Sequence, residues 1–325
     1  MRLLRMAAVA CGALALVGMT ALTAPGAMAA TRDCHCTPVT SITPPPATDG
    51  PFNVTEGPGG TWYAEGDTIV RVRPNGVQDQ FALPNPDTAD AGWLAWSGGS
   101  RVWFADRGGR IGSIDAHGTV VEYPVPPDAD GNAGPNGLVI DGNTVWFTDP
   151  PSNRIGRLDI HSGHITMYAV PTADSWPLGI TLGPDHALWF TERNAGQLGR
   201  ITVHGAFKEW ALDPDSFPNR ITVGSDGAIW FTELHTSMIG RMSMSWHLTE
   251  TPIDGGPVGI TRAPDGHLYV ALYASSQLAR LDWSGHVTKT WDVPGALLVA
   301  ASQGALWLTS PFTNSVTEVD VYCDN

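Results

Sequence analysis

The chain has 325 residues, of which 42% are hydrophobic and 15% charged, so it can bury a sizeable core and a disordered chain is excluded. Its formal net charge of −14 excludes a broad electrostatic contact with nucleic acid phosphates or anionic lipid. The 37 Gly and 26 Pro leave little room for long helices and indicate many short strands joined by turns.

The beginning of the chain has the pattern of a secretory signal. Two arginines precede an apolar run over residues 6–22, and the small-residue sequence Ala27-Met28-Ala29 follows. This order is typical of a signal peptide that is removed after cleavage at small residues. We expect residues 1–29 to be the signal, residues 30–325 to form the mature domain, and the protein to be secreted into the extracellular space. No other stretch has the length needed to span a bilayer, so membrane insertion is not expected.

Three cysteines remain after the signal: Cys34, Cys36 and Cys323. In an exported protein a disulfide is the default expectation. Two of the cysteines begin the mature chain and the third lies near its end, so a bond between them would join the two termini. We expect Cys36 to pair with Cys323, with Cys34 as the alternative partner. The Cys34-His35-Cys36 motif has no second ligand pair at a spacing that suits a metal site.

A repeat of about forty residues runs through the mature chain. Its marker, a pair of apolar or aromatic residues, occurs seven times: Trp62-Tyr63, Trp103-Phe104, Trp146-Phe147, Trp189-Phe190, Trp230-Phe231, Tyr269-Val270 and Trp307-Leu308. Each copy contains four short apolar stretches separated by turn signals, which predicts four antiparallel strands. The sequence therefore predicts an all-β fold, a seven-bladed β-propeller with four antiparallel strands per blade and the Trp residues packed between blades.

The last repeat offers only three strands before the chain ends. The segment Val39–Thr43, just after the signal, is similar to the fourth strands of other repeats, such as the one that begins at Val120. We therefore expect the N-terminal strand to close the last blade. Cys36 lies just before this strand, and Cys323 just after its expected neighbour.

The repeat pattern Pro-x-Gly-Ile-Thr, Leu-Trp-Phe-Thr-Glu and Ile-Gly-Arg, which is clearest over residues 177–210, resembles that of the virginiamycin B lyase family. The resemblance covers essentially the whole mature chain. It implies a seven-bladed propeller and a magnesium-dependent enzyme that opens streptogramin B depsipeptides by elimination across the ester bond. It also implies catalysis by His residues beside the Pro of the Pro-x-(Gly/Ala)-Ile motif and by a carboxylate after Trp-Phe.

The catalytic histidines of that family are absent here. The residues at or near the corresponding position of each repeat are Phe52, Trp93, Asn136, Leu178, Asn219, Val258 and Ala296. Most histidines fall in turns predicted for the opposite face, whereas His235 lies in a loop on the face where the Pro-x-Gly segments begin. This face surrounds the mouth of the central channel, where loops from every blade converge.

Carboxylates recur after the Trp-Phe pair, as Asp106, Asp149, Glu192 and Glu233. Recurrence at equivalent positions favours a structural task, such as accepting backbone N–H bonds from the following loop. Residues that break the repeat are better candidates for a site, and on the mouth face these include Asn136, Asn219, Arg220 and His235.

If the protein is an enzyme, we expect His235 to be its base or metal ligand, because imidazole titrates near neutral pH and suits proton abstraction next to a carbonyl. Glu233 and Glu192 would assist it. Asn136 and Asn219 would orient the substrate, and Arg220 would meet a developing negative charge. A divalent cation, Mg²⁺ or Ca²⁺, is expected by resemblance, and the sequence does not assign its ligands.

Two functions remain open from the sequence. The first is a secreted lyase or lactone hydrolase, whose substrate is a lactone or a cyclic depsipeptide ester. The second is a non-catalytic extracellular binding propeller that captures a small ligand or a protein partner. In either case we expect a monomer.

Overall fold

The structure is a computed structural model that describes residues 39–44, 50–302 and 304–321. It confirms the predicted fold: seven sheets of four antiparallel strands stand in a ring, and helix is limited to two short 3-10 turns in the described residues. None of the described residues form a helix that is long and apolar enough to cross a membrane. The expected signal sequence and the cysteines Cys34, Cys36 and Cys323 lie outside the described residues.

The first three blades follow one another along the chain, each with its first strand innermost. Blade I contains β2 (Val54–Gly57), β3 (Gly60–Glu65), β4 (Thr68–Val72) and β5 (Gln78–Ala82). Blade II contains β6 (Ala91–Ala95), β7 (Arg101–Asp106), β8 (Arg110–Asp115) and β9 (Val120–Pro124). Blade III contains β10 (Leu138–Asp141), β11 (Thr144–Asp149), β12 (Arg154–Asp159) and β13 (Ile165–Ala169), with the 3-10 turn η1 (Pro150–Ser152).

The remaining blades repeat this order. Blade IV contains β14 (Pro177–Leu182), β15 (Ala187–Glu192), β16 (Gln197–Thr202) and β17 (Phe207–Ala211). Blade V contains β18 (Pro218–Val223), β19 (Ile229–Glu233), β20 (Met238–Met242) and β21 (Leu248–Pro252). Blade VI contains β22 (Pro257–Arg262), β23 (Leu268–Leu272), β24 (Gln277–Leu281) and β25 (Val287–Asp292). Blade VII contains β26 (Leu298–Ser302), β27 (Ala305–Ser310) and β28 (Ser315–Val319), the 3-10 turn η2 (Pro311–Thr313), and β1 (Val39–Ile42).

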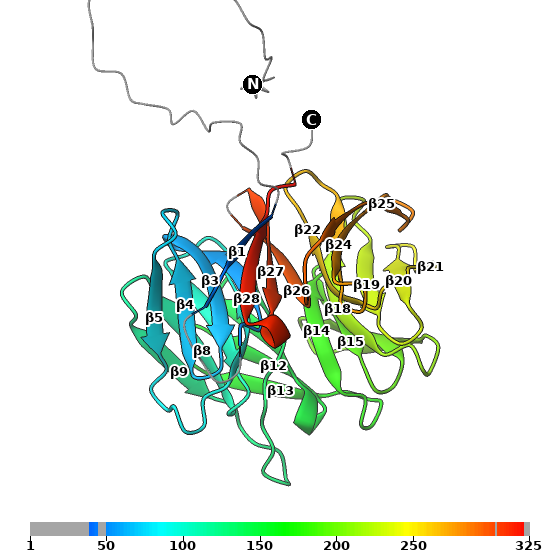
Figure 1. Ribbon diagram of the computed structural model, residues 1–325. Helices are drawn as coiled ribbons and strands as arrows, with labels where there is room; N and C mark the ends of the chain where they lie inside the picture. The colour runs from blue at the N-terminus through cyan, green and yellow to red at the C-terminus, as the bar shows by residue number, and fades with distance from the viewer. Residues whose placement is uncertain (1–38, 45–49, 303, 322–325) are drawn as a thin grey trace, which may run out of the picture. The chain divides into compact units, whose positions relative to one another are not determined.

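The N-terminal strand closes the ring, as the sequence predicts. β1 pairs antiparallel with β28, and the two strands lie side by side (Figure 1). Val39 is opposite Val319. The innermost strands contact one another in order around the ring, and β26 of blade VII meets β2 of blade I. Because both ends of the chain contribute to blade VII, closure depends on contacts between residues far apart in sequence.

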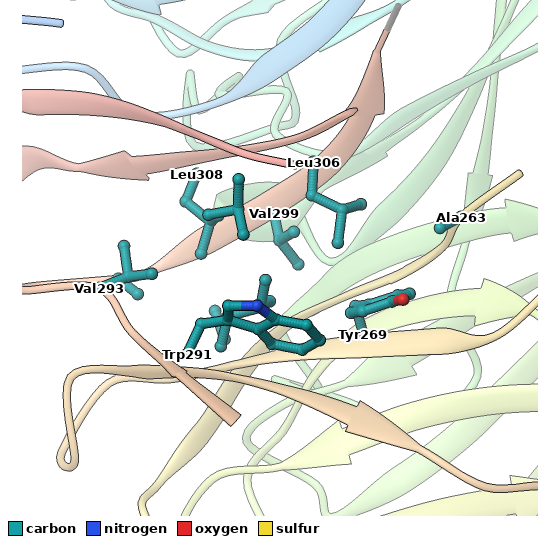
Figure 2. Close-up of a cluster of buried hydrophobic side chains, with 11 residues drawn as sticks. Ala263, Tyr269, Trp291, Val293, Val299, Leu306 and Leu308 are labelled. Atoms are coloured by element: carbon teal, nitrogen blue, oxygen red, sulfur yellow. The ribbon is translucent and has the colours of Figure 1, made fainter. Parts of the chain in front are cut away.

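The core lies between adjacent blades. The Trp residues of the repeat are buried there: Trp62, Trp146, Trp189 and Trp230 are at most 1% exposed. Figure 2 shows one such layer, in which Tyr269 and Trp291 of blade VI pack with Val299, Leu306 and Leu308 of blade VII. The large apolar area removed from water at each interface favours the closed ring.

In four blades the residue after the apolar pair is a threonine, which ties its blade to the next one. Thr191 of blade IV donates its hydroxyl proton to the Asn219 carbonyl of blade V at 2.8 Å and accepts the Gly179 N–H of its own blade at 2.9 Å. Thr148 and Thr232 donate in the same way to the following blades. Thr309 does so across the closure, to the Phe52 carbonyl at 2.7 Å.

Strand register fixes which loops share the mouth face. Pro177 is opposite Glu192, and Pro218 is opposite Glu233. The start of each first strand therefore lies beside the end of its second strand, as predicted. His186 and His267 lie in the turns at the other end of these hairpins.

Candidate functional site at the channel mouth

One blade carries a charged side chain where its neighbours have glycine. Gly179, Arg220 and Gly259 occupy the same register position on the first strands of blades IV, V and VI. A Cβ at Gly179 would lie 2.6 Å from the Asn219 carbonyl oxygen of the adjacent blade, so close strand packing requires glycine there. Blade V accommodates a full side chain, and this side chain enters the channel.

Arg220 spans the channel. Its guanidinium carbon lies 4.3 Å from the ring centroid of Trp93 in blade II, which is not adjacent to blade V. Both residues line a channel cavity of about 210 Å³. Arg220 is 5% exposed, and its Nε and Nη1 are buried without a hydrogen-bond partner. Burial, together with the charges of Arg193 and Arg107, lowers the pKa of Arg220 to about 9. The group therefore remains protonated at neutral pH.

A second cation lies on the same face in blade IV. The guanidinium carbon of Arg193 is 4.1 Å from the ring centroid of Phe217, and burial lowers its pKa. The His235 ring stacks on Phe217 at 4.1 Å between centroids, with 11° between the planes. Arg193 Nε has no hydrogen-bond partner. The structure thus places His235 at the mouth, as expected, and brings it against an aromatic ring that also contacts an arginine.

The third cation is Arg107 of blade II. It is paired with Asp90 and lies over the Phe52 ring at 5.0 Å. Arg107, Asn136 and Trp176 line a second, open cavity of about 370 Å³. The Oδ1 atoms of Asn136 and Asn219 are buried without a hydrogen-bond partner.

Two aromatic residues at the mouth have strained backbones. Trp176 and Phe217 each precede the proline that begins the first strand, and their φ angles are 57° and 54°. Gly50 and Gly256 precede the corresponding prolines of blades I and VI, also with positive φ. Bulky residues rarely adopt this left-handed conformation, and strain of this kind is concentrated at functional sites.

The carboxylates Glu192 and Glu233 turn away from the channel. A Cβ at Gly199, on the third strand, would lie 2.7 Å from Glu192 Oε1. Burial, and then the charge of Glu209 on the outer strand, raise the pKa of Glu192 to about 8. Burial also raises the pKa of Glu233, followed by the charge of Glu250 on its outer strand. The structure thus does not bring these groups together with His235 at the channel mouth.

The matching aspartates accept backbone N–H groups, as recurrence predicts, but from the loop before the first strand as well as from the loop that follows the carboxylate. Asp106 accepts the backbone N–H groups of Asp90 and Gly108 at 2.7 and 2.8 Å. Asp149 accepts the Gly134 N–H at 2.8 Å and pairs with Arg154 at 2.8 Å. These carboxylates organise the loops of the mouth face.

The side chains at the mouth do not fit a magnesium site. Mg²⁺ is bound through carboxylates, whereas the charged groups that face this channel are the guanidinium groups of Arg107, Arg193 and Arg220. Among the described residues, no group of three or more His, Cys, Asp or Glu side chains could hold a metal ion. The carboxylate of Asp90 on this face is paired with Arg107, and the amide oxygens of Asn136 and Asn219 are neutral. The mouth is suited to an anion rather than to a cation.

The sequence singles out Arg220, Asn136, Asn219 and His235, which lie on this face, and it places Trp93 near the proline motif. It does not single out Arg107 and Arg193. Arg107 and Arg193 each follow the recurring carboxylate directly, where the other blades have Gly66, Pro150, Leu234, Tyr273 and Pro311. Two arginines at one position of a repeat that otherwise lacks a charge there were the signal that could have identified them.

Residues 29–161 and 139–324 match the Virginiamycin B lyase family. The virginiamycin B lyase of Nocardia farcinica is 30% identical over 132 residues, which is 40% of this chain and 44% of that relative. The chain therefore matches less than half the length of this curated relative.

Solved structures extend the likeness over most of the fold. The virginiamycin B lyase of Staphylococcus aureus superimposes with a TM-score of 0.79 at 29% identity, covering 86% of this chain and 98% of that one. A catalytically inactive variant of that enzyme, determined with quinupristin, gives a TM-score of 0.78 at 28% identity over the same shares. YCF48 bound to a D1 peptide, at 11% identity and a TM-score of 0.70, shares the fold alone, over 87% of this chain and 97% of its own.

Proposed function

The chain belongs to the virginiamycin B lyase family, and we propose that it is a secreted binding member of that family, which captures a small molecule at the channel mouth without opening it. The single observation that carries this proposal is the set of side chains at the mouth. Guanidinium groups and aromatic rings stand there, and the carboxylates Glu192 and Glu233 turn away into their blades. Elimination needs a base as well as a means of polarising the carbonyl. The guanidinium groups could polarise a carbonyl, but Glu192 and Glu233 are not placed to act as the base, which leaves that role to His235.

Aromatic side chains on the mouth face supply the contact area for a ligand. Trp176, Tyr273 and Phe312 are 37%, 41% and 72% exposed, in blades IV, VI and VII. Tyr273 and Phe312 lie 5.6 Å apart between ring centroids. Trp176 also lines the mouth cavity. Exposed aromatic rings favour a binding surface, since each offers a large rigid area at low entropic cost.

Titration with quinupristin, by calorimetry, tests the proposal. We expect saturable binding that Trp176→Ala weakens and Trp283→Ala does not. Trp283 is the matched control because it is 49% exposed but lies in a turn between third and fourth strands, on the opposite face. Elimination opens a ring without changing its mass, so reaction is followed by chromatographic retention and fragmentation, with Mg²⁺ present and absent. Unchanged quinupristin is the expected result, and magnesium-dependent ring opening would contradict the proposal.

The position of His235 favours one second candidate, a lyase or lactone hydrolase acting on a cyclic ester. Its exposed imidazole stacks on Phe217 at the mouth and is placed to take a proton from a bound lactone. A screen of lactones and depsipeptides with wild type and His235→Ala decides between the two. Turnover that the substitution abolishes would establish the enzyme, and turnover that it leaves unchanged would remove His235 from the mechanism.

A further inference from the structure

We propose that the channel mouth binds the carboxylate of a small, ring-bearing organic acid, with Arg220 and Arg193 holding the anion and the aromatic residues of the mouth contacting the ring. This inference rests on the binding function proposed above and names its ligand class.

The charge of Arg220 is buried and uncompensated. Eight arginines of the described residues pair with aspartates, among them Arg71 with Asp79 and Arg200 with Asp185. Those without such a pair, apart from Arg220, are half-buried or exposed, namely Arg157, Arg193, Arg262 and Arg280. Within the same residues, Arg220 and Arg193 pair with no carboxylate, although the chain has a net charge of −14. Buried charges are normally paired, because an unpaired one costs free energy. An anion from solution would complete this site.

Donors of Arg220 and Arg193 lack acceptors in this structure. Trp93 covers one face of the Arg220 guanidinium, and a face contact leaves the N–H groups at the edge of the plane. Nε and Nη1 of Arg220 and Nε of Arg193 are buried without an acceptor, and Arg220 lines the channel cavity. Planar guanidinium edges match planar carboxylates and form short, charge-assisted hydrogen bonds with them. The site therefore offers donors and a positive field, and the carboxylate of Asp90 on this face is already paired with Arg107.

The two cavities limit the size of the ligand. The channel cavity beside Arg220 holds about 210 Å³, and the mouth cavity beside Trp176 about 370 Å³. These volumes lie at or below the lower end of the range for small-molecule sites and suit a small acid. Asn136, which lines the mouth cavity, and Asn219 have buried amide oxygens without a hydrogen-bond partner.

Thermal unfolding at constant ionic strength tests this proposal, with phenylacetate as the probe and sodium chloride as the reference. We expect phenylacetate to raise the Tm of wild type in a saturable way, and its uncharged amide, phenylacetamide, to raise it far less. The same titrations with inorganic phosphate and sulfate distinguish the class of anion. A Tm that responds to phosphate but not to phenylacetate overturns the carboxylate assignment, as does a Tm that responds to none of them.

Arg220→Met separates binding from structure. Methionine keeps an unbranched stem against Trp93 but removes the charge, so we expect the affinity for phenylacetate to fall about tenfold or more. Without ligand the variant should unfold at or above the wild-type Tm, because an unpaired buried charge has gone. Arg200→Met is the matched control, since Arg200 also lies over a Trp ring, at 5.9 Å, but on the opposite face. Undiminished phenylacetate binding by Arg220→Met overturns the proposal.

The two proposals fail separately. If quinupristin binds but carboxylates do not, the binding function stands and the inferred ligand class is wrong. If carboxylates bind through Arg220 and cyclic depsipeptides do not, the anion site stands alone.

Discussion

The guanidinium of Arg220 and the ring of Trp93 meet across the central channel, 4.3 Å apart, although they belong to blades V and II. A propeller channel is lined by the first strand of every blade, so a long side chain at one position reaches the strand on the far side. Here that contact places a buried cation at the centre of the ring. The channel mouth is thereby a charged and partly aromatic surface, and its properties depend on the few residues that break the repeat.

The strained conformation of Trp176 gives the first prediction. Its φ of 57° is readily adopted by glycine, as at Gly256, but is costly for any residue with a Cβ. We expect Trp176→Gly to be more stable than Trp176→Ala by about 1 kcal/mol, because the two variants differ in backbone strain and both lack the ring. Chemical unfolding measures the difference. Equal stability of the two would show that the position is not strained.

The buried hydroxyl of Thr191, between blades IV and V, gives the second prediction. Thr191→Val keeps the shape but leaves the Gly179 N–H and the Asn219 carbonyl without their partner. We expect a loss of about 2 kcal/mol in the free energy of unfolding, since buried unsatisfied groups keep their desolvation cost. Thr290→Val, at an exposed strand position, is the control and should change stability by less than about 0.5 kcal/mol. Similar losses in both variants would argue against a tie between blades.

The fold was predictable because the sequence pattern of one blade occurs seven times in the chain. The Trp-Phe pair marks each second strand, and the missing fourth strand of the last repeat identifies Val39–Thr43 as its replacement. Repetition averages out local ambiguity, since each blade must bury the same face against its neighbour.

The site was predictable only in part, because it depends on contacts between unlike blades. Sequence separates Arg220 from Trp93 by more than a hundred residues, and no local pattern indicates that they touch. The sequence also did not indicate the direction of the Glu192 side chain, because a carboxylate at the end of a second strand can face the channel or the outer strands. In the structure the side chain lies against Gly199 of the third strand. Recurrence in the sequence identified structural residues well, as Asp106 and Asp149 show.

The pairing of Cys323 with Cys36, or alternatively with Cys34, stays a prediction, because all three cysteines lie outside the described residues. Val39, which follows Cys36 by three residues, is opposite Val319, which precedes Cys323 by four residues. In the chain-entropy model a bond that closes a loop of nearly the whole domain stabilises it by roughly 5 kcal/mol. We expect non-reducing peptide mapping to find the two termini linked, and reduction to lower the Tm. Absence of that link, or an unchanged Tm after reduction, would contradict the prediction.

The buried carboxyl of Glu192 should make stability depend on pH in a defined direction. Burial and Glu209 raise its pKa to about 8 in the folded protein, whereas the unfolded chain has the ordinary value near 4.5. Between these values the folded state holds a proton that the unfolded state has released. This contribution to stability is fully present below about pH 4.5 and is lost as the pH rises through about 8, by up to about 1.4 kcal/mol per pH unit.

Glu192→Gln removes this titration while keeping the size of the side chain. We expect the free energy of unfolding of the variant to fall less steeply than that of wild type between pH 5 and pH 8. The stability of the variant relative to wild type therefore increases as the pH rises. Urea unfolding at each pH unit measures the two slopes. Because Glu65 and Glu233 also have raised pKa values, wild type and variant share a background slope, and only the difference belongs to Glu192. Parallel curves would show that the carboxyl of Glu192 titrates alike in the folded and unfolded states.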